Sequence, residues 1–133
     1  MSLRPVIYDT NFLIAIQGRL KRFNRADAIA WLKHKDDGVA YIPRMVEIEF
    51  STGFPADSDA TPHLRYFTVI PMSEAVLAET VRVMRELHGT GQGIGAADSI
   101  IAATARLYGL PLVTENIRHF KRIKGLDVRS FIA

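Results

Sequence analysis

The sequence contains no cysteine among its 133 residues, which excludes disulfide bonds and metal sites built from thiolates. It also lacks any uninterrupted apolar run approaching the roughly 18 residues that cross a membrane. Asp9 and Asn11 interrupt the apolar residues near the N-terminus that could otherwise form a signal-peptide core. We therefore expect a soluble, cytoplasmic protein. The length suits one domain over residues 1–133 with a single core.

Several familiar functional motifs are also missing. The four histidines show neither the spacing of metal ligands nor a partner for a nucleophile; they are His34, His63, His88 and His119. The glycine-rich stretch 89–95 lacks the Lys-Ser/Thr pair of a phosphate-binding P-loop and follows a predicted helix, so we interpret it as a hinge.

The charge balance is modestly basic. Lys and Arg number 17 against 14 Asp and Glu, a formal net charge of +3. If Asp9, Glu49 and Asp98 share one pocket, the remaining surface carries 17 basic against 11 acidic residues, or +6. A basic surface around an acidic pocket suits a polyanion such as a nucleic acid. The alternative is that the excess mainly aids solubility.

Short apolar runs alternate with longer helical patterns along the chain. Strands are predicted at 4–8, 39–42, 67–70 and 112–114, with a fifth at 126–128 on the edge. Helices are predicted at 10–17, 26–35, 44–52, 63–66 and 96–108, and after Ser73. A basic connector (19–25) and a polar loop (54–62) separate some of them. This order predicts a three-layer α/β/α sandwich around a mostly parallel sheet of four to five strands.

Finer features of two helices are predicted as well. Gly53 fits a left-handed cap of helix 44–52, and Ser73 fits the N-cap of the helix that follows it. That helix has an apolar face, which we expect to be buried, at Val76, Thr80, Val83 and Leu87, widened by Leu77, Val81 and Met84.

Asp9 directly follows the first predicted strand and precedes another apolar stretch. Ligands of open α/β sheets bind outside the carboxyl ends of the strands, where this residue would lie. Thr10 and Asn11 beside it could orient its carboxylate or a bound water. The structural alternative is an ordinary helix N-cap.

Two further acids lie among apolar residues. Glu49 is expected near the sheet-facing stripe of its helix with Met45 and Thr52, and only one of Glu47 and Glu49 can face the site. Asp98 lies in the first turn of helix 96–108, which we expect to be buried. The alternatives are two surface glutamates and an aspartate that complements the helix dipole.

Taken as a set, Asp9, Glu49 and Asp98 favour a shared cation, because three gathered carboxylates repel one another without one. Hard cations such as Mg²⁺ prefer oxygen ligands. A basic cluster near the C-terminus forms either a solvated helix face or a rim that binds phosphates; it comprises Arg118, His119, Lys121, Arg122 and Lys124.

Four segments together resemble the PIN domain, and in particular the VapC-type toxins of toxin–antitoxin pairs. They are Val6–Asn11, Ile42–Gly53, Ala97–Ala105 and Leu110–Phe120. The resemblance implies a parallel sheet between helices and Mg²⁺- or Mn²⁺-dependent endoribonuclease activity. It also implies frequent homodimers and a cognate antitoxin protein as partners, besides the RNA substrate.

The resemblance also assigns roles by position. Asp9, Glu49 and Asp98 match acids of the family's metal site, and Thr10, Asn11 and Thr114 match its supporting polar residues. Asn116 matches a fourth catalytic position that is often Asp. Members with this Asn usually carry an acid three residues later, where this chain has His119. We therefore expect one firmly held metal, with a second recruited partly by substrate phosphate; the neighbouring Glu115 would ordinarily point elsewhere.

Other functions remain open from the sequence. One is a PIN nuclease for RNA processing without an antitoxin. Another, motivated by Asn116 and His119, is a degenerate PIN domain that binds RNA or protein without cleavage. A metal-dependent phosphatase with an aspartyl nucleophile ranks last, because its second carboxylate would be needed where Asn11 stands.

Overall fold

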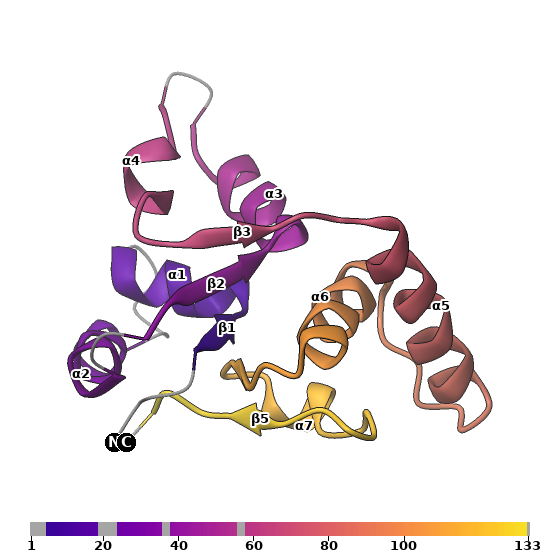
Figure 1. The fold of residues 1–133 in the computed structure, drawn as a ribbon. Helices are drawn as coiled ribbons and strands as arrows, with labels where there is room; N and C mark the ends of the chain where they lie inside the picture. The colour runs from indigo at the N-terminus through magenta and orange to yellow at the C-terminus, as the bar shows by residue number, and fades with distance from the viewer. Residues whose placement is uncertain (1–4, 19–23, 36–37, 56–57, 133) are drawn as a thin grey trace.

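A computed structural model describes residues 5–18, 24–35, 38–55 and 58–132. In these residues the strands form one parallel sheet with the order β3-β2-β1-β4-β5 (Figure 1). The strands are β1 (Val6–Tyr8), β2 (Ala40–Pro43), β3 (Thr68–Ile70), β4 (Leu112–Val113) and β5 (Val128–Arg129). The predicted fifth strand is thus confirmed at the edge, shifted toward the C-terminus.

Helices connect the strands and cover the sheet. They are α1 (Thr10–Gln17), α2 (Arg25–Lys35), α3 (Arg44–Thr52), α4 (Thr61–Leu64), α5 (Glu74–His88), α6 (Ala96–Tyr108) and α7 (Ile117–Phe120). Figure 1 shows α1 and α2 on one side of the sheet and α5 and α6 on the other, which confirms the three-layer α/β/α arrangement. Within the described ranges, no helix has the length and apolar character needed to span a membrane.

Local sequence signals located most elements well. The predicted bounds of α1, α3 and α6 match the structure, and Ser73 caps α5 by accepting a hydrogen bond from the Val76 N–H. The short helix predicted at 63–66 instead begins at Thr61, because Pro62 fits its first turn. Most of the basic connector at 19–25, namely residues 19–23, lies outside the described residues.

Two expectations about α3 are wrong, one about its end and one about its buried face. Gly53 ends α3 in a right-handed conformation with φ −78°, because its N–H closes a final turn of the 3₁₀ type onto the Phe50 carbonyl. In α3 the buried residues are Val46 and Phe50, whereas Met45 is half-buried and Thr52 is exposed.

The apolar face of α5 is also narrower than predicted. Val76, Thr80, Val83 and Leu87 are buried, as expected. Leu77, Val81 and Met84 do not widen that face, since their side chains are 42%, 48% and 41% exposed. The physical reason is that α5 packs chiefly against α6, a single neighbouring helix, which covers only one stripe of its surface.

The core forms where small residues of α6 meet the sheet. Ile101, Ala102, Ala103 and Ala105 are fully buried. Alanine side chains let the helix approach the strands closely, so that the packed interior leaves few voids. Four strand residues, Ile7, Tyr8, Leu112 and Val113, are also fully buried in this core. The central strands β1 and β4 are therefore held rigidly, which matters because both lead directly into the candidate site.

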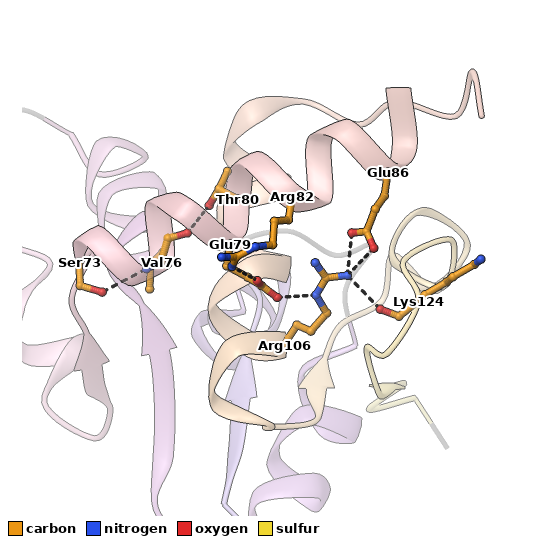
Figure 2. A network of polar contacts seen from close by, with 8 residues as sticks. All are labelled: Ser73, Val76, Glu79, Thr80, Arg82, Glu86, Arg106 and Lys124. Atoms are coloured by element: carbon orange, nitrogen blue, oxygen red, sulfur yellow. Dashed lines mark hydrogen bonds and ion pairs between the residues drawn. The ribbon is translucent and has the colours of Figure 1, made fainter. Parts of the chain in front are cut away.

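A polar network fixes α5 against α6 away from the sheet (Figure 2). The Arg106 guanidinium lies 2.6 Å from Glu79 and 2.9 Å from Glu86, and donates to the Lys124 carbonyl at 3.1 Å. Burial raises the pKa of Glu79, but hydrogen bonds from Arg106 and Arg82 outweigh it and leave that pKa below its usual range. Arg106 thus joins α5, α6 and the segment after α7.

Removing the Arg106 charge should destabilise the fold. In Arg106→Met the stem still packs, but the Glu79 carboxylate, only 12% exposed, loses its main partner. We expect a loss of roughly 2–4 kcal/mol in the free energy of unfolding, measured with urea. The control Glu86→Gln alters the partner that is 50% exposed and should cost under about 1 kcal/mol. Equal losses in the two variants would contradict this account.

Candidate functional site

The candidate site lies where the connections of the sheet diverge. The chain runs from β1 to β2 on one side, while β4 pairs with β1 on the other. Such a switch point leaves a crevice outside the carboxyl ends of the two central strands. Asp9 follows β1 and Thr114 follows β4, so both residues lie at this point. Their backbones are joined by the Asp9 N–H, which donates to the Val113 carbonyl at 3.1 Å.

Asp9 is the most deeply buried acid of the site, since only 6% of the residue is exposed. Its Oδ1 accepts from the Thr10 N–H at 2.7 Å, and its Oδ2 accepts from the Thr114 hydroxyl at 2.8 Å. The Asn11 amide lies 3.4 Å from the same Oδ2. Asp9 therefore caps α1, as the structural alternative predicts, and also lines the pocket, while its role toward a ligand stays a prediction.

The electrostatic environment of Asp9 opposes its ionisation. Burial raises its pKa to about 6, despite hydrogen bonds from Thr114 and Thr10 that act in the opposite direction. The negative charges of Asp98 and Glu49 raise it further. The three carboxylates are thus close enough to repel, and a positive charge among them would relieve the repulsion.

Glu49 reaches the site from α3. Its Oε1 accepts a hydrogen bond of 2.7 Å from the Thr10 hydroxyl, which ties the helix to the start of α1. Glu47 instead forms an ion pair with Arg44 on the helix surface. The prediction that only one of the two glutamates faces the site is therefore confirmed.

Asp98 enters from the first turn of α6. Its side chain is 29% exposed, so the expectation that this turn would be buried is wrong for Asp98, although Ser99 beside it is fully buried. The Oδ2 atom of Asp98 lies 3.0 Å from His119 Nδ1. His119 also contacts Asn116, with 2.9 Å between His119 Nδ1 and Asn116 Nδ2.

The supporting residues form one continuous network around Thr114. Its hydroxyl donates to Asp9, and accepts from the Asn116 N–H at 2.9 Å and from the Asn11 amide at 3.2 Å. Asn11 Oδ1 in turn accepts from the Glu115 N–H at 3.2 Å. The segment after β4 is therefore fixed to the start of α1 by side chains from both.

These side chains enclose a pocket of about 460 Å³. Its lining residues are Asp9, Thr10, Asn11, Ile14, Glu49, Asp98, Glu115 and Asn116. The sequence interpretation missed Ile14, although its position four residues after Thr10 places both on one face of α1. Glu115 lines the pocket too, but its Oε1 accepts a 3.2 Å hydrogen bond from Ser130 near β5.

The donor atoms of the pocket suit a hard, partly hydrated cation. Three carboxylates and the Asn116 amide are oxygen-rich ligands, and Mg²⁺ keeps several waters while it contacts only one or two carboxylates. Among the described residues, however, no three His, Cys, Asp or Glu side chains are clustered tightly enough to hold one ion together. The pocket therefore fits a cation contacted partly through water, rather than a fully enclosed one.

The basic residues flank this pocket without lining it. Arg118, Lys121 and Arg122 are exposed on and just after α7, which begins directly after Asn116. Arg122 contacts the Gln92 carbonyl at 3.5 Å, so it also lies against the loop before α6. His119 differs from its neighbours because its ring faces Asp98.

The raised pKa of Asp9 predicts a pH dependence of stability. The pKa of Asp9 is about 6 in the folded protein, against an ordinary value of 3.8. Between these pH values the folded protein keeps Asp9 protonated while the unfolded chain releases the proton. Raising the pH therefore lowers the free energy of unfolding. In metal-free buffer, Asp9→Asn should therefore gain about 2 kcal/mol relative to the original chain between pH 4.5 and 7.5. Denaturant unfolding at both pH values measures this difference. A difference independent of pH would refute the assignment.

Comparison with known proteins gives this site a context. The PIN domain model matches residues 6–126. Ribonuclease VapC1 of Rickettsia felis is 28% identical, over 92% of this chain and 93% of that protein. The tRNA(fMet)-specific endonuclease VapC of Shigella flexneri is 38% identical, over 47% of this chain and 48% of that protein.

Solved structures show the same fold. DNA-bound VapBC from Salmonella typhimurium superposes with a TM-score of 0.78 at 21% identity, covering 97% of this chain and 98% of that one. FitAcB from Neisseria gonorrhoeae gives a TM-score of 0.77 at 21% identity, and the match covers 95% of this chain and 97% of that one. The family model spans most of the chain, including β1 to β4 and every acid of the pocket. The chain belongs to the PIN domain family.

Proposed function

We propose that this protein is an endoribonuclease that hydrolyses RNA phosphodiester bonds with Mg²⁺ or Mn²⁺, as the toxin of a toxin–antitoxin pair. The observation that carries the proposal is the convergence of Asp9, Glu49 and Asp98, from three distant segments, on one pocket of a PIN domain. The curated relatives named ribonuclease support the reaction. The similar VapBC structures support a cognate antitoxin.

The pocket residues divide into ligands and their supports. Asp9, Glu49 and Asp98 would hold the cation, with Asn116 at the edge of the same pocket. When bound, a divalent cation lowers the pKa of a coordinated water and neutralises charge on the phosphate. Thr114 holds the Asp9 carboxylate and Thr10 holds that of Glu49, so each side chain is oriented before substrate arrives.

The substrate and partners follow from the surroundings of the pocket. Arg118, Lys121 and Arg122 lie beside it, where they would contact phosphates along the RNA without reading its sequence. An antitoxin would inhibit the enzyme by covering or displacing the metal site. Homodimer formation is part of the same proposal. It rests on the resemblance to VapC-type toxins.

A second candidate is a PIN domain that binds RNA without cleavage. Two observations favour it: His119 stands where an acid is usual, and the described residues contain no ready-made group of three metal ligands. A processing nuclease without an antitoxin would share the chemistry of the leading proposal and differ only in its partner.

The acids of α3, together with Asp98 of α6, provide a test of cleavage with a matched control. Glu49→Gln and Asp98→Asn should each lower the cleavage rate on structured RNAs more than about 100-fold, because loss of a ligand costs more than the 10–100-fold typical of its supports. Glu47→Gln, two residues away on the surface of α3, should leave the rate unchanged. Chelation should abolish cleavage.

The outcomes separate the candidates. Equal rates for Glu49→Gln and Glu47→Gln would refute the assignment of Glu49. RNA binding by the unmodified protein, without cleavage in Mg²⁺ or Mn²⁺, would favour the non-cleaving domain.

The number of bound metals is a separate prediction. Of the four carboxylates that line the pocket, Glu115 is hydrogen-bonded to Ser130, and the other three offer enough charge for one divalent cation, while a second would need the negative charge of substrate phosphate. We therefore expect calorimetric titration with Mn²⁺ to give one tight site per chain without RNA. Two tight sites under those conditions would contradict this reasoning.

A further inference from the structure

His119 contacts two residues of the candidate metal site that are far apart in the sequence. Its Nδ1 lies 3.0 Å from Asp98 Oδ2 on α6 and 2.9 Å from Asn116 Nδ2 at the start of α7. The pocket is lined by Asp98 and Asn116 but not by His119. The imidazole therefore supports these two residues from outside the pocket.

The hydrogen-bonding chemistry of the His119 ring, the Asp98 carboxylate and the Asn116 amide decides whether His119 Nδ1 carries a proton. A carboxylate oxygen only accepts hydrogen bonds, so a lone pair on Nδ1 would repel Asp98 at this distance. A proton on Nδ1 turns the contact into a charge-assisted hydrogen bond. The structure places the Asn116 NH₂ nitrogen 2.9 Å from Nδ1, and two N–H donors cannot satisfy one another, so the Asn116 side-chain amide must be flipped to present its oxygen to the same proton. That orientation leaves the Asn116 NH₂ group directed away from Nδ1.

This arrangement has a consequence for the carboxylate. With Oδ2 of Asp98 held by His119, rotation of the carboxylate is restricted and Oδ1 remains available for a ligand. Ligand side chains generally depend on such outer hydrogen bonds for orientation and affinity. An acid at position 119 would instead add a negative charge beside Asp98, and could bind Asp98 only if one of the two were protonated.

We propose that His119 is a positioning residue, which donates its Nδ1 proton to Asp98 and thereby sets the affinity of the pocket for its divalent cation. This inference rests on the proposed function for the presence of a cation. The contact between His119 and Asp98 itself does not, because it joins two side chains of the chain directly.

The protonation of Nδ1 can be observed directly in metal-free protein. Long-range ¹H–¹⁵N NMR spectra distinguish a ring that carries hydrogen on Nδ1 from one that carries it only on Nε2. We expect a proton on Nδ1 of His119, whether or not Nε2 carries one as well. A ring protonated only on Nε2 would overturn the proposal.

Three substitutions then test the consequence for metal binding. His119→Asn keeps an N–H donor at the position of Nδ1, His119→Gln moves it one atom further out, and His119→Phe removes it. We expect Mn²⁺ affinity, measured by calorimetry, to stay near that of the original chain in His119→Asn. It should fall about 10–100-fold in His119→Phe, with His119→Gln also impaired. Arg85→Gln, at an exposed residue of α5, should have no effect.

The possible failures have different meanings. Unchanged Mn²⁺ affinity in His119→Phe, with thermal unfolding confirming a folded protein, would overturn the positioning role. An effect of His119→Asn as large as that of His119→Phe would overturn the role of the Nδ1 donor. If the unmodified protein binds no Mn²⁺, the proposed function fails together with the metal part of this inference, and the NMR result still decides whether His119 donates to Asp98.

Discussion

Burial of the Asp9 carboxylate at the end of β1 is the constraint on which the rest of the site depends. An ionised carboxylate that is 6% exposed must be hydrogen-bonded, and each donor that reaches it fixes another segment of the chain. The Thr10 N–H fixes the start of α1, and the Thr114 hydroxyl fixes the residue after β4. The parallel pairing of β1 with β4 makes this possible, since it brings both strand ends to the same edge.

The same network explains why the pocket keeps a net negative charge. The Thr114 hydroxyl donates only one proton, to Asp9, and otherwise accepts from the Asn116 N–H and the Asn11 amide. Threonine and asparagine orient the Asp9 carboxylate without cancelling its charge. Asp98 and Glu49 add to that charge and raise the pKa of Asp9. The nearby cations, Arg118, Lys121 and Arg122, lie outside the pocket, so its negative charge is left for a small cation while a polyanion can approach from outside.

The sequence was sufficient where local chemistry determines the outcome. The alternation of strands and helices predicted the layers, and the bounds of α6 followed from its Ala-rich pattern between Gly95 and Gly109. The placement of Asp9, Glu49 and Asp98 in one pocket was expected from Asp9 after a strand, Asp98 in a first helical turn and Glu49 among apolar residues of its helix, together with the family resemblance. The exposed residues of α5 could not be predicted, because periodicity shows which residues share a face but not how much of that face a neighbouring helix covers.

The contact of His119 with Asp98 shows a second limit of sequence reasoning. In the sequence His119 belongs to a basic run and stands where the resemblance leads one to expect an acid, but neither feature predicts its contact with Asp98. In the structure, α7 begins at the carboxyl edge of β4, beside the first turn of α6, and this placement turns one member of the run toward an acid. A hydrogen-bond donor at this position lowers the repulsion among the pocket carboxylates, whereas another acid would raise it. Relative to the acid that the resemblance leads one to expect at this position, His119 thus reduces the negative charge at the site while it orients one of the remaining carboxylates.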